Sequence, residues 1–505
     1  MVHFPNEIWL GVASHLNLPA DVCASEDETV DEHDKIIQQT LVSLSLVSKQ
    51  LRAIFQPQLY CTFVKRKREG PEHRLLKANS EWLHRYYQRD ERSFRATRQQ
   101  TSLENFILTL LRRPDLAAMV QHFRVDWSVE SNALPGRLQR LYQKLPLCTS
   151  TSNAFMDAIK TFKGFERLRP QFRRAWKEHM LDGEEGAQVA LLLTLLSGLR
   201  SLNVDTTKYL GPFVQELCTA ILDPRPRSWI LTSAGGVLKK CPTKWTQQPP
   251  QILPNLASLS VSSFRGGPVA IQSPAVLFVL PSLTSFSGRG WQGCHEILHL
   301  PSLIEFSALL HLKLERCKLD GRGLADVLGR CKNLRSLEIS SGSAMDGFLT
   351  IDPGLPDALL SMADTLEHLI LMAPRHYIWE FIDLRSFKKL RYLQVSLRFL
   401  AADRWNEDDE DDEDDEDEDS YVHELLPTGI EEIVIRHVWD VIGPHLNALL
   451  DTFTPTAEFP NLRSMKLYVR EHDNSDLERD LFNVQQRARG HGLDFEFEKE
   501  PANNR

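Results

Sequence analysis

Residues 309–319 read LLHLKLERCKL, and this stretch decides how we expect the chain to fold. Its apolar residues follow the pattern L-x-x-L-x-L-x-x-C-x-L. Between Leu312 and Leu314 apolar and polar residues alternate, which is typical of a β-strand with one face in a hydrophobic core. The pattern therefore predicts a short strand whose leucines point inward, while His311 and Lys313 point outward.

The first six positions of this pattern recur along the chain, mostly after a turn-forming residue. With some replacements, the copies begin at Leu199, Leu256, Leu283, Leu309, Leu334, Leu366, Leu390, Ile430 and Leu462. The spacing is 25 residues from Leu309 to Leu334, 32 to Leu366 and 24 to Leu390. Residues 323–329 and 357–363, between copies, are compatible with helices. The pattern resembles leucine-rich repeats, which have a period of roughly 20–29 residues. We therefore expect an α/β fold, an irregular leucine-rich-repeat solenoid of parallel strands with outer helices.

The charge of the chain is concentrated in one segment. The 505 residues have a net charge of −9, but residues 407–419 are thirteen consecutive acids. Without them, 55 acidic residues face 59 basic ones, so the remaining chain is nearly neutral. Such a balance does not favour binding to nucleic acid or to anionic membranes. The acidic run is interpreted as a solvated, disordered loop, or alternatively as a site that attracts a basic partner.

Composition excludes several other classes of protein. No apolar run is long enough to span a membrane, and no signal peptide is evident. The eight cysteines include no C-x-x-C pair, which argues against a zinc ribbon and favours a reducing, intracellular location, in the cytoplasm, the nucleus or both. The basic run 65–68 is either a nuclear-localisation patch or a solvated segment.

The N-terminal residues resemble an F-box of the kind found in fungal F-box proteins. The resemblance is carried by FPNEI at 4–8, by LVSLSLVSKQLRAIF at 41–55 and by PQLY at 57–60. It departs from the family pattern in having Phe4 before the proline, Leu51 where many members have Trp, and an acidic insertion. It implies docking on a Skp-type adaptor, and through it a cullin, with the repeats holding an unknown target protein. By motif match, the implied adaptor-binding residues are Phe4, Pro5, Ile8, Leu16, Leu44, Leu46, Val47 and Leu51.

These patterns predict the following organisation. The F-box covers 1–63, with the acidic insertion at 17–39 and a helix that begins at an N-cap at Thr40. A mixed, mainly helical connector follows over 64–190, with helices at 75–87, 102–111 and 187–196 and a strand near 123–127. The repeats cover 191–402, the acidic loop 403–420 and the terminal repeats 421–499, with a final edge strand near 495–497.

The outward positions of the repeat strands are the candidate target-binding residues. Those with the strongest case are His311, Lys313, Arg335, Glu338, His368, Arg391, Tyr392 and Gln394. Further outward positions are Ser336, Glu367, Glu431, Glu432, Arg463 and Lys466. Their charges are mixed, which suits a protein or peptide ligand, and Tyr392 is the expected anchor because tyrosine is enriched at binding hot spots. The alternative is that all of them are ordinary solvated residues.

The sequence favours a non-enzymatic function without a cofactor or metal. It contains no phosphate-binding or nucleophile motif. His295 and His299 form an H-E-x-x-H pattern that could hold zinc in a hydrolase. The segment ends at Pro301 without the long helix or third ligand that such a site needs. The other alternative is a plain leucine-rich-repeat scaffold whose N-terminal helices only cap the solenoid.

Overall fold

A computed structural model gives the fold of the chain. The structure describes Trp9, Val12, 28–65, 102–125, 147–162, 165, 170–205, 253–262, 269–270, 280–292, 306, 308–317, 321–340, 354–372, 383–400, 422–438, 442–451, 459–470 and 475–500. The chain divides into two compact units, Met1–Leu283 and Thr284–Arg505. None of the described helices is long and apolar enough to cross a membrane.

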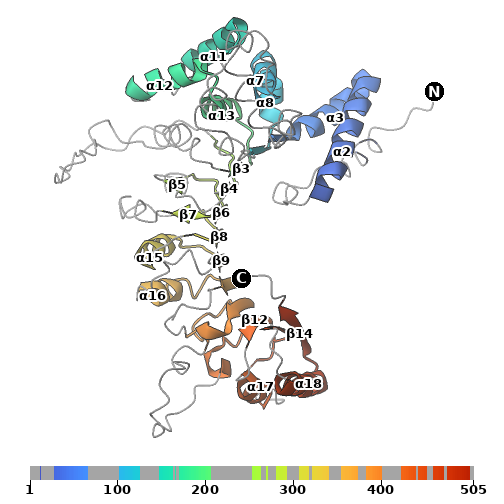
Figure 1. Cartoon of the computed structure of the whole chain (residues 1–505), viewed down its shortest axis with the longest axis vertical. Coiled ribbons are helices and arrows are strands. Elements are labelled where there is room, and N and C mark those ends of the chain that lie inside the picture. The colour runs from blue at the N-terminus through green and yellow to red at the C-terminus, as the bar shows by residue number, and fades with distance from the viewer. Residues whose placement is uncertain are drawn as a thin grey trace, which may run out of the picture. The chain divides into compact units, whose positions relative to one another are not determined.

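In the first unit, the strands β1 and β2 lie between helices along the chain, and β3, β4 and β5 follow the last helix (Figure 1). Its helices are α2 (Glu28–Val47), α3 (Lys49–Cys61), α7 (Ser102–Arg112), α8 (Pro114–Met119), α11 (Thr149–Thr161), α12 (Pro170–Leu181) and α13 (Glu185–Leu195). Its strands are β1 (Thr62–Lys65), β2 (His122–Val125), β3 (Ser201–Asp205), β4 (Ser258–Ser262) and β5 (Val269–Ala270).

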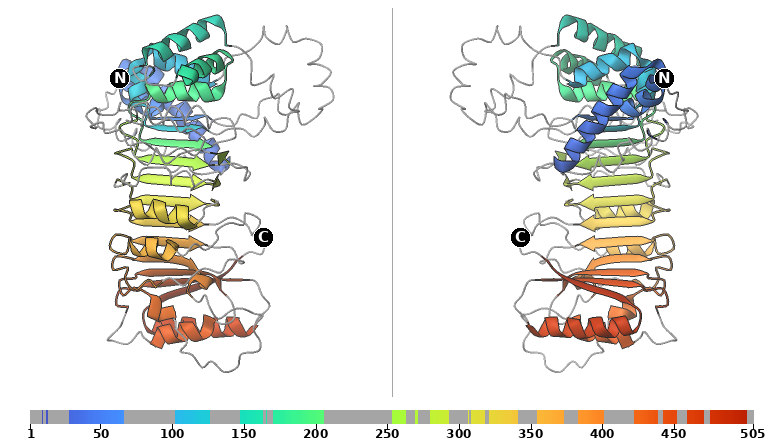
Figure 2. Two further views of the ribbon diagram at one scale, coloured as in Figure 1. Left: turned by 90° about the vertical axis from the view of Figure 1, so that its left-hand side faces the viewer. Right: turned by 90° about the vertical axis from the view of Figure 1, so that its right-hand side faces the viewer.

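The second unit alternates strands with helices for most of its length. Its strands are β6 (Ser285–Arg289), β7 (Trp291–Gln292), β8 (His311–Glu315), β9 (Ser336–Ser340), β10 (His368–Met372), β11 (Tyr392–Ser396), β12 (Glu432–Val438), β13 (Ser464–Arg470) and β14 (Asp494–Glu500). Its helices are α15 (Gly321–Arg330), α16 (Gly354–Leu360), η7 (Leu397–Phe399), η8 (Val422–Leu425), α17 (Ile442–Asp451) and α18 (Ser475–Gly490). Figure 2 shows α15 and α16, in yellow and light orange, on one face of the strands.

Among the described residues, four strands form a sheet in the first unit and eight form a sheet in the second. Their order is β1-β2-β3-β4 in the first unit and β6-β8-β9-β10-β11-β12-β13-β14 in the second. Every pairing within each unit is parallel. This confirms the expected α/β fold with a solenoid-like parallel sheet and N-terminal helices.

The leucine positions of the repeat explain the register. Leu309, Leu312 and Leu314 are each only 1% exposed, so the motif buries one leucine of the turn and two leucines of the strand in the core. The main chain of each turn then binds the turn of the preceding repeat: Arg335 N donates to Leu310 O at 2.8 Å, and Glu367 N donates to Arg335 O at 2.8 Å. Each repeat is therefore positioned by buried leucines and by hydrogen bonds to its neighbour.

The sheet begins earlier than the start at 191 that the repeat pattern predicts. β1 and β2 end at or before residue 125; β1 pairs in parallel with β2, and β2 pairs in parallel with β3. They do not match the leucine pattern because phenylalanines replace leucines in both strands. Phe63 stacks on Phe106 with ring centroids 3.8 Å apart, and Phe123 is 1% exposed. The stretch predicted as a connector thus contributes strands to the sheet as well as helices.

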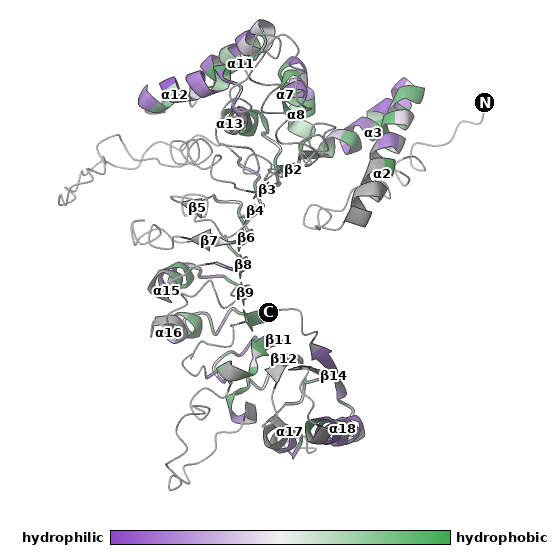
Figure 3. Cartoon of the chain, viewed as in Figure 1, coloured by the Kyte–Doolittle hydropathy of each residue, from purple (hydrophilic) through white to green (hydrophobic). Residues whose placement is uncertain are grey.

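The helices predicted at 102–111 and 187–196 are present as α7 and α13. In Figure 3, α13 is coloured hydrophobic along most of its length. It is a core helix, because Val189 and Leu192 within it, and Leu196 directly after it, are fully buried. The helix predicted at 75–87 lies outside the described residues. The helix predicted at 323–329 is present as α15. Of the helix predicted at 357–363, only residues 357–360 are helical, because α16 ends at Leu360.

The prediction of a loop over 17–39 is wrong from residue 28 onward. Helix α2 already begins at Glu28, so Asp31, Glu32 and Asp34 are helical. Thr40 is not an N-cap but an interior residue of this helix, and its hydroxyl donates to Ile36 O at 2.8 Å. The helix is favoured by apolar residues at helical spacing, because Ile37 and Leu41 of α2 both reach the core.

Candidate functional site

Two surfaces are candidates for function, and the first is formed by the helix pair α2–α3. Ile37, Leu41, Leu51 and Phe55 make a small core between the two helices, and Phe55 is completely buried. The ring of Trp9 meets Phe55 edge-on with centroids 6.2 Å apart. The pair therefore has a hydrophobic core of its own.

Ser48 fixes the connection between these helices. It is the N-cap of α3, and its hydroxyl accepts a hydrogen bond from Leu51 N at 3.1 Å. The guanidinium of Arg52 reaches back and donates from Nε to Ser45 O at 3.2 Å. The corner between α2 and α3 is thus held by both a cap and a side-chain bond.

Several large apolar side chains of α2 lie outside this core. Leu46 is 71% exposed, Val47 70%, Ile36 57% and Val42 42%. On a helix with 3.6 residues per turn these four positions fall on the side away from Ile37 and Leu41. We call Ile36, Val42, Leu46 and Val47 the exposed face of α2. Exposed apolar residues on one side of a helix make it a candidate surface for binding a partner.

The structure separates the predicted adaptor-binding residues into distinct groups. Leu46 and Val47 are exposed, Leu44 is partly buried, and Leu51 belongs to the core. Phe4, Pro5, Ile8 and Leu16 lie outside the described residues. Sequence reasoning missed Ile36, because it falls in the stretch interpreted as a loop, and Val42, which lies within the quoted stretch 41–55 but is not among the motif-matched positions.

The second candidate surface is the outward face of strands β8 to β14. The register places His311, Ser336, His368 and Tyr392 in one row across the strands. Lys313, Glu338, Ile370 and Gln394 form the next row. Six of the eight predicted target-binding residues therefore lie in neighbouring rows on one face, which we call the strand face, and the other two, Arg335 and Arg391, lie in turns that enter it.

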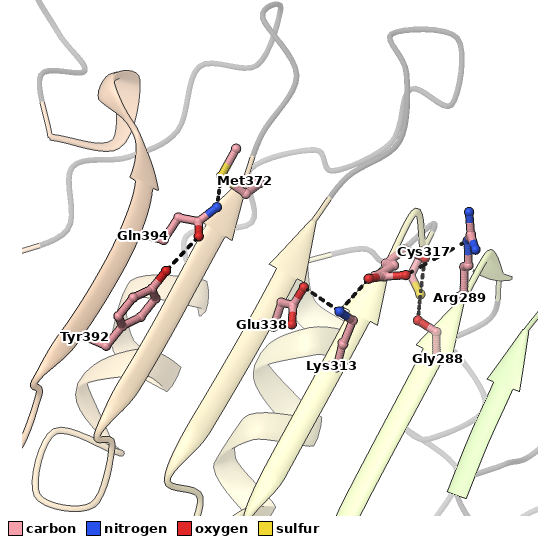
Figure 4. A network of polar contacts seen from close by, with 9 residues as sticks. Gly288, Arg289, Lys313, Cys317, Glu338, Met372, Tyr392 and Gln394 are labelled. Carbon is pink, nitrogen blue, oxygen red and sulfur yellow. Dashed lines mark hydrogen bonds and ion pairs between the residues drawn. The ribbon is translucent and has the colours of Figure 1, made fainter. Parts of the chain in front are cut away.

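On strands β6, β8 and β9 this face is ionic (Figure 4). The Lys313 ammonium lies 2.6 Å from Glu315 and 2.9 Å from Glu338, and Arg289 lies 4.0 Å from Glu315. Burial lowers the pKa of Lys313, but hydrogen bonds to Glu315 and Glu338 outweigh it and raise the pKa above its usual value. The charges in this part of the face are satisfied within the protein.

On strands β10 and β11 the face changes to aromatic and neutral polar groups. Tyr392 lies beside His368 with ring centroids 5.7 Å apart. Its hydroxyl donates to Gln394 Oε1 at 3.0 Å, and Gln394 Nε2 approaches Met372 Sδ at 3.6 Å (Figure 4). Burial, followed by the nearby Glu432 carboxylate, raises the pKa of Tyr392, so it is a neutral hydrogen-bonding group at physiological pH.

The two predicted arginines lie in the turns that precede the strands. Arg335 Nη1 lies 3.7 Å from Glu367 Oε1, and Arg391 Nε lies 3.6 Å from Glu431 Oε1. Both guanidiniums are more than half exposed, so these pairs are loose and contribute little to stability. They remain accessible to a ligand.

Sequence reasoning did not single out Arg436 and Tyr468, which extend the aromatic part of the face. The Arg436 guanidinium lies over the Tyr468 ring at 4.2 Å, and the Lys466 ammonium lies 5.2 Å from the same ring. The available signal was the continued alternation beyond the six-residue motif, since β12 and β13 are seven residues long.

Within the described part of the chain, no group of His, Cys, Asp or Glu could hold a metal ion. His295 and His299 of the H-E-x-x-H pattern lie outside the described residues, so the zinc alternative stays a sequence prediction. The thiol of Cys331 is buried, and burial raises its pKa to about 12, which makes it a poor nucleophile.

Comparisons with known proteins give little beyond this geometry. No family model matches the chain, and no curated protein matches it. Among solved structures, the chain is similar to one in the crystal structure of the Rad7 and Elc1 complex in yeast, with 12% identity and a TM-score of 0.24. That match covers 81% of this chain and 97% of the other.

Proposed function

We propose that the chain is a non-catalytic substrate receptor of an SCF-type ubiquitin ligase. In this function α2–α3 binds a Skp-type adaptor, and through it a cullin, while the strand face holds the target protein. Such a receptor contributes by positioning its target near the transfer machinery, which raises the effective concentration without a nucleophile or cofactor. The proposed location is intracellular, in the cytoplasm, the nucleus or both.

The observation that carries this proposal is the exposure of Leu46 and Val47. If the N-terminal helices only capped the solenoid, these residues would be expected to pack on the first repeat. They lie instead at the C-terminal end of a helix that already has its own core with α3. Burial of a leucine or valine side chain contributes about 1.5–3 kcal/mol, so a partner that covered both would gain substantial affinity.

Titration calorimetry of the purified chain with a Skp-type adaptor tests the proposal. The double variant Leu46→Asp, Val47→Asp should weaken binding by at least about a hundredfold, because burying unpaired charges is costly. A matched control is Phe482→Asp on α18, which places a charge at another exposed apolar position, 53% exposed. This control should bind with unchanged affinity.

Two results would contradict the adaptor proposal. One is an absence of binding by the unmodified chain, and the other is equal affinity of the double variant and the control. Circular dichroism of each variant verifies that its helices remain folded. If the double variant keeps its helical signal and still binds the adaptor, the scaffold alternative is the better description.

The target-binding part of the proposal is tested separately. Proximity labelling in cells identifies proteins near the chain, and Tyr392→Ala combined with Arg391→Glu should remove a subset of them. A variant with Lys388→Glu is the control, because Lys388 is exposed but lies outside the strand face. Retention of every labelled protein by the Tyr392 variant would place recognition elsewhere.

A further inference from the structure

Among the described residues, β14, the last strand of the second unit, is paired with another strand on one side only. It follows β13 in the strand order and is hydrogen-bonded to it in parallel. Asp494 N donates to Arg463 O at 2.9 Å, so the main chain of Asp494 faces β13. Because successive residues of a strand turn their main-chain groups to opposite sides, those of Phe495 and Phe497 face the outer edge.

The outer edge is only partly covered. From α18, the Gln485 side-chain amide donates to Phe495 O at 2.9 Å and so satisfies one outward carbonyl. No described residue makes a hydrogen bond to the outward main-chain groups of Phe497. An edge with available N–H and C=O groups is a template for another strand.

The side chains of β14 indicate which kind of strand fits. Asp494, Glu496 and Glu498 are exposed and lie on the same face, whereas Phe495 is buried on the other. Lys466 of β13 already contacts Glu498 at 2.6 Å and Glu496 at 3.6 Å, which shows that this row accepts a lysine from a neighbouring strand. Both carboxylates remain more than half exposed and available to a second cation.

Charge also argues against pairing between two copies of β14. A second copy would bring its own row of acids opposite or diagonal to this one, and like charges in cross-strand positions are destabilising. A strand with basic residues at every second position would place opposite charges there instead. The edge therefore discriminates between possible partners by charge.

We propose that the outer edge of β14 binds an extended segment of a partner protein as an added strand, and that this segment carries lysine or arginine at alternate positions. Main-chain hydrogen bonds to Phe497 provide the pairing, and Asp494, Glu496 and Glu498 select the basic side chains. The proposal depends on the sheet alone and stands whether or not α2–α3 binds an adaptor.

Fluorescence anisotropy with a labelled eight-residue peptide of alternating threonine and lysine tests this inference. A peptide with glutamate in place of lysine is the control. The full-length chain should bind the lysine peptide at low ionic strength and lose affinity as salt is added, and it should bind the glutamate peptide at least about tenfold more weakly. Equal binding of both peptides, or binding of neither, would overturn the proposal.

A matched pair of variants tests the edge itself. Phe497→Pro and Phe497→Ala both remove the phenyl ring, but only proline removes the outward N–H, and neither removes a hydrogen bond to β13. The proline variant should bind the lysine peptide about tenfold more weakly than the alanine variant. Equal affinities of the two variants, with unchanged circular dichroism, would show that the edge does not bind the peptide.

A second variant decides the question if proline disturbs folding. Asp494→Asn, Glu496→Gln and Glu498→Gln together neutralise the acidic row without changing its shape, and should weaken lysine-peptide binding at least about tenfold. Unchanged affinity would overturn the charge selection. Sedimentation of the chain without peptide gives a further check, because self-association that Phe497→Pro abolishes would identify a second copy as the occupant instead.

Discussion

Gly198 allows two backbone segments of the first unit to approach closely, and replacing it should destabilise that unit. It lies in the turn between α13 and β3, directly before the buried Leu199. A Cβ atom added at Gly198 would lie 2.2 Å from Ala118 O and 3.1 Å from Ala118 C, at the end of α8. Both obstacles are main-chain atoms, so no side-chain rotation can relieve the contact.

The size of the effect follows from this distance. An ordinary contact requires at least 3.4 Å, so in Gly198→Ala the turn and α8 must separate by roughly 1 Å. Overpacking of this kind costs about 1–3 kcal/mol. For a unit of this size each kcal/mol lowers the melting temperature by about 2–4 °C, so a decrease of roughly 2–12 °C is expected.

Gly329→Ala provides the matched control. Gly329 lies in α15, and a Cβ added there meets nothing within 4 Å. Since alanine is a better helix former than glycine, this substitution should stabilise the protein by up to about 1 kcal/mol. Differential scanning calorimetry measures both variants. The reasoning is refuted if Gly198→Ala melts at or above the temperature of the unmodified chain.

Three further predictions concern other parts of the chain. Phe55→Ala should destabilise the α2–α3 pair by about 3–5 kcal/mol, because Phe55 is fully buried, and hydrogen exchange should show faster exchange of α2 amides while those of β9 to β11 are unchanged. Cys331 should resist iodoacetamide at pH 8 in the native protein, because burial raises its pKa to about 12 and leaves almost no thiolate, whereas the exposed Cys148 should react; modification of both at equal rates by mass spectrometry would contradict this. Deletion of 407–419, which lie outside the described residues, should change the melting temperature by less than about 2 °C, because thirteen consecutive acids repel one another and are not expected to join a core; a larger decrease would mean that they are docked.

The repeat strands were predictable because their inward leucines are fixed by burial. Leu337, Leu369 and Leu393 are all fully buried, and the alternation around them identifies the outward face. The strand predicted near 123–127 is present as β2, but β1 was not predicted, and neither was the pairing of these two strands with the repeat strands. Each is four residues long, and phenylalanines such as Phe123 replace the leucines, so their place in the sheet depends on packing with helices such as α7.

The candidate surfaces were predictable in part. The motif identified Leu46 and Leu51 together, but only packing against α3 determines that Leu51 is buried and Leu46 is exposed. On the strand face, alternation identified Tyr392 and Gln394. It could not indicate that Lys313 is neutralised by Glu315 and Glu338, because that depends on side-chain positions along β8 and on the neighbouring strand β9.

The hydrogen bonds between successive turns affect how the chain can fold during its synthesis. Within each unit, every strand of the sheet pairs with the strands that come before and after it in the sheet order, which follows the sequence. Contacts between repeats are therefore local, and contacts of low sequence separation form fast. As the polypeptide leaves the ribosome, each repeat such as β9 can join the strand already in place before the next one is synthesised, so folding can keep pace with translation from β6 toward β14.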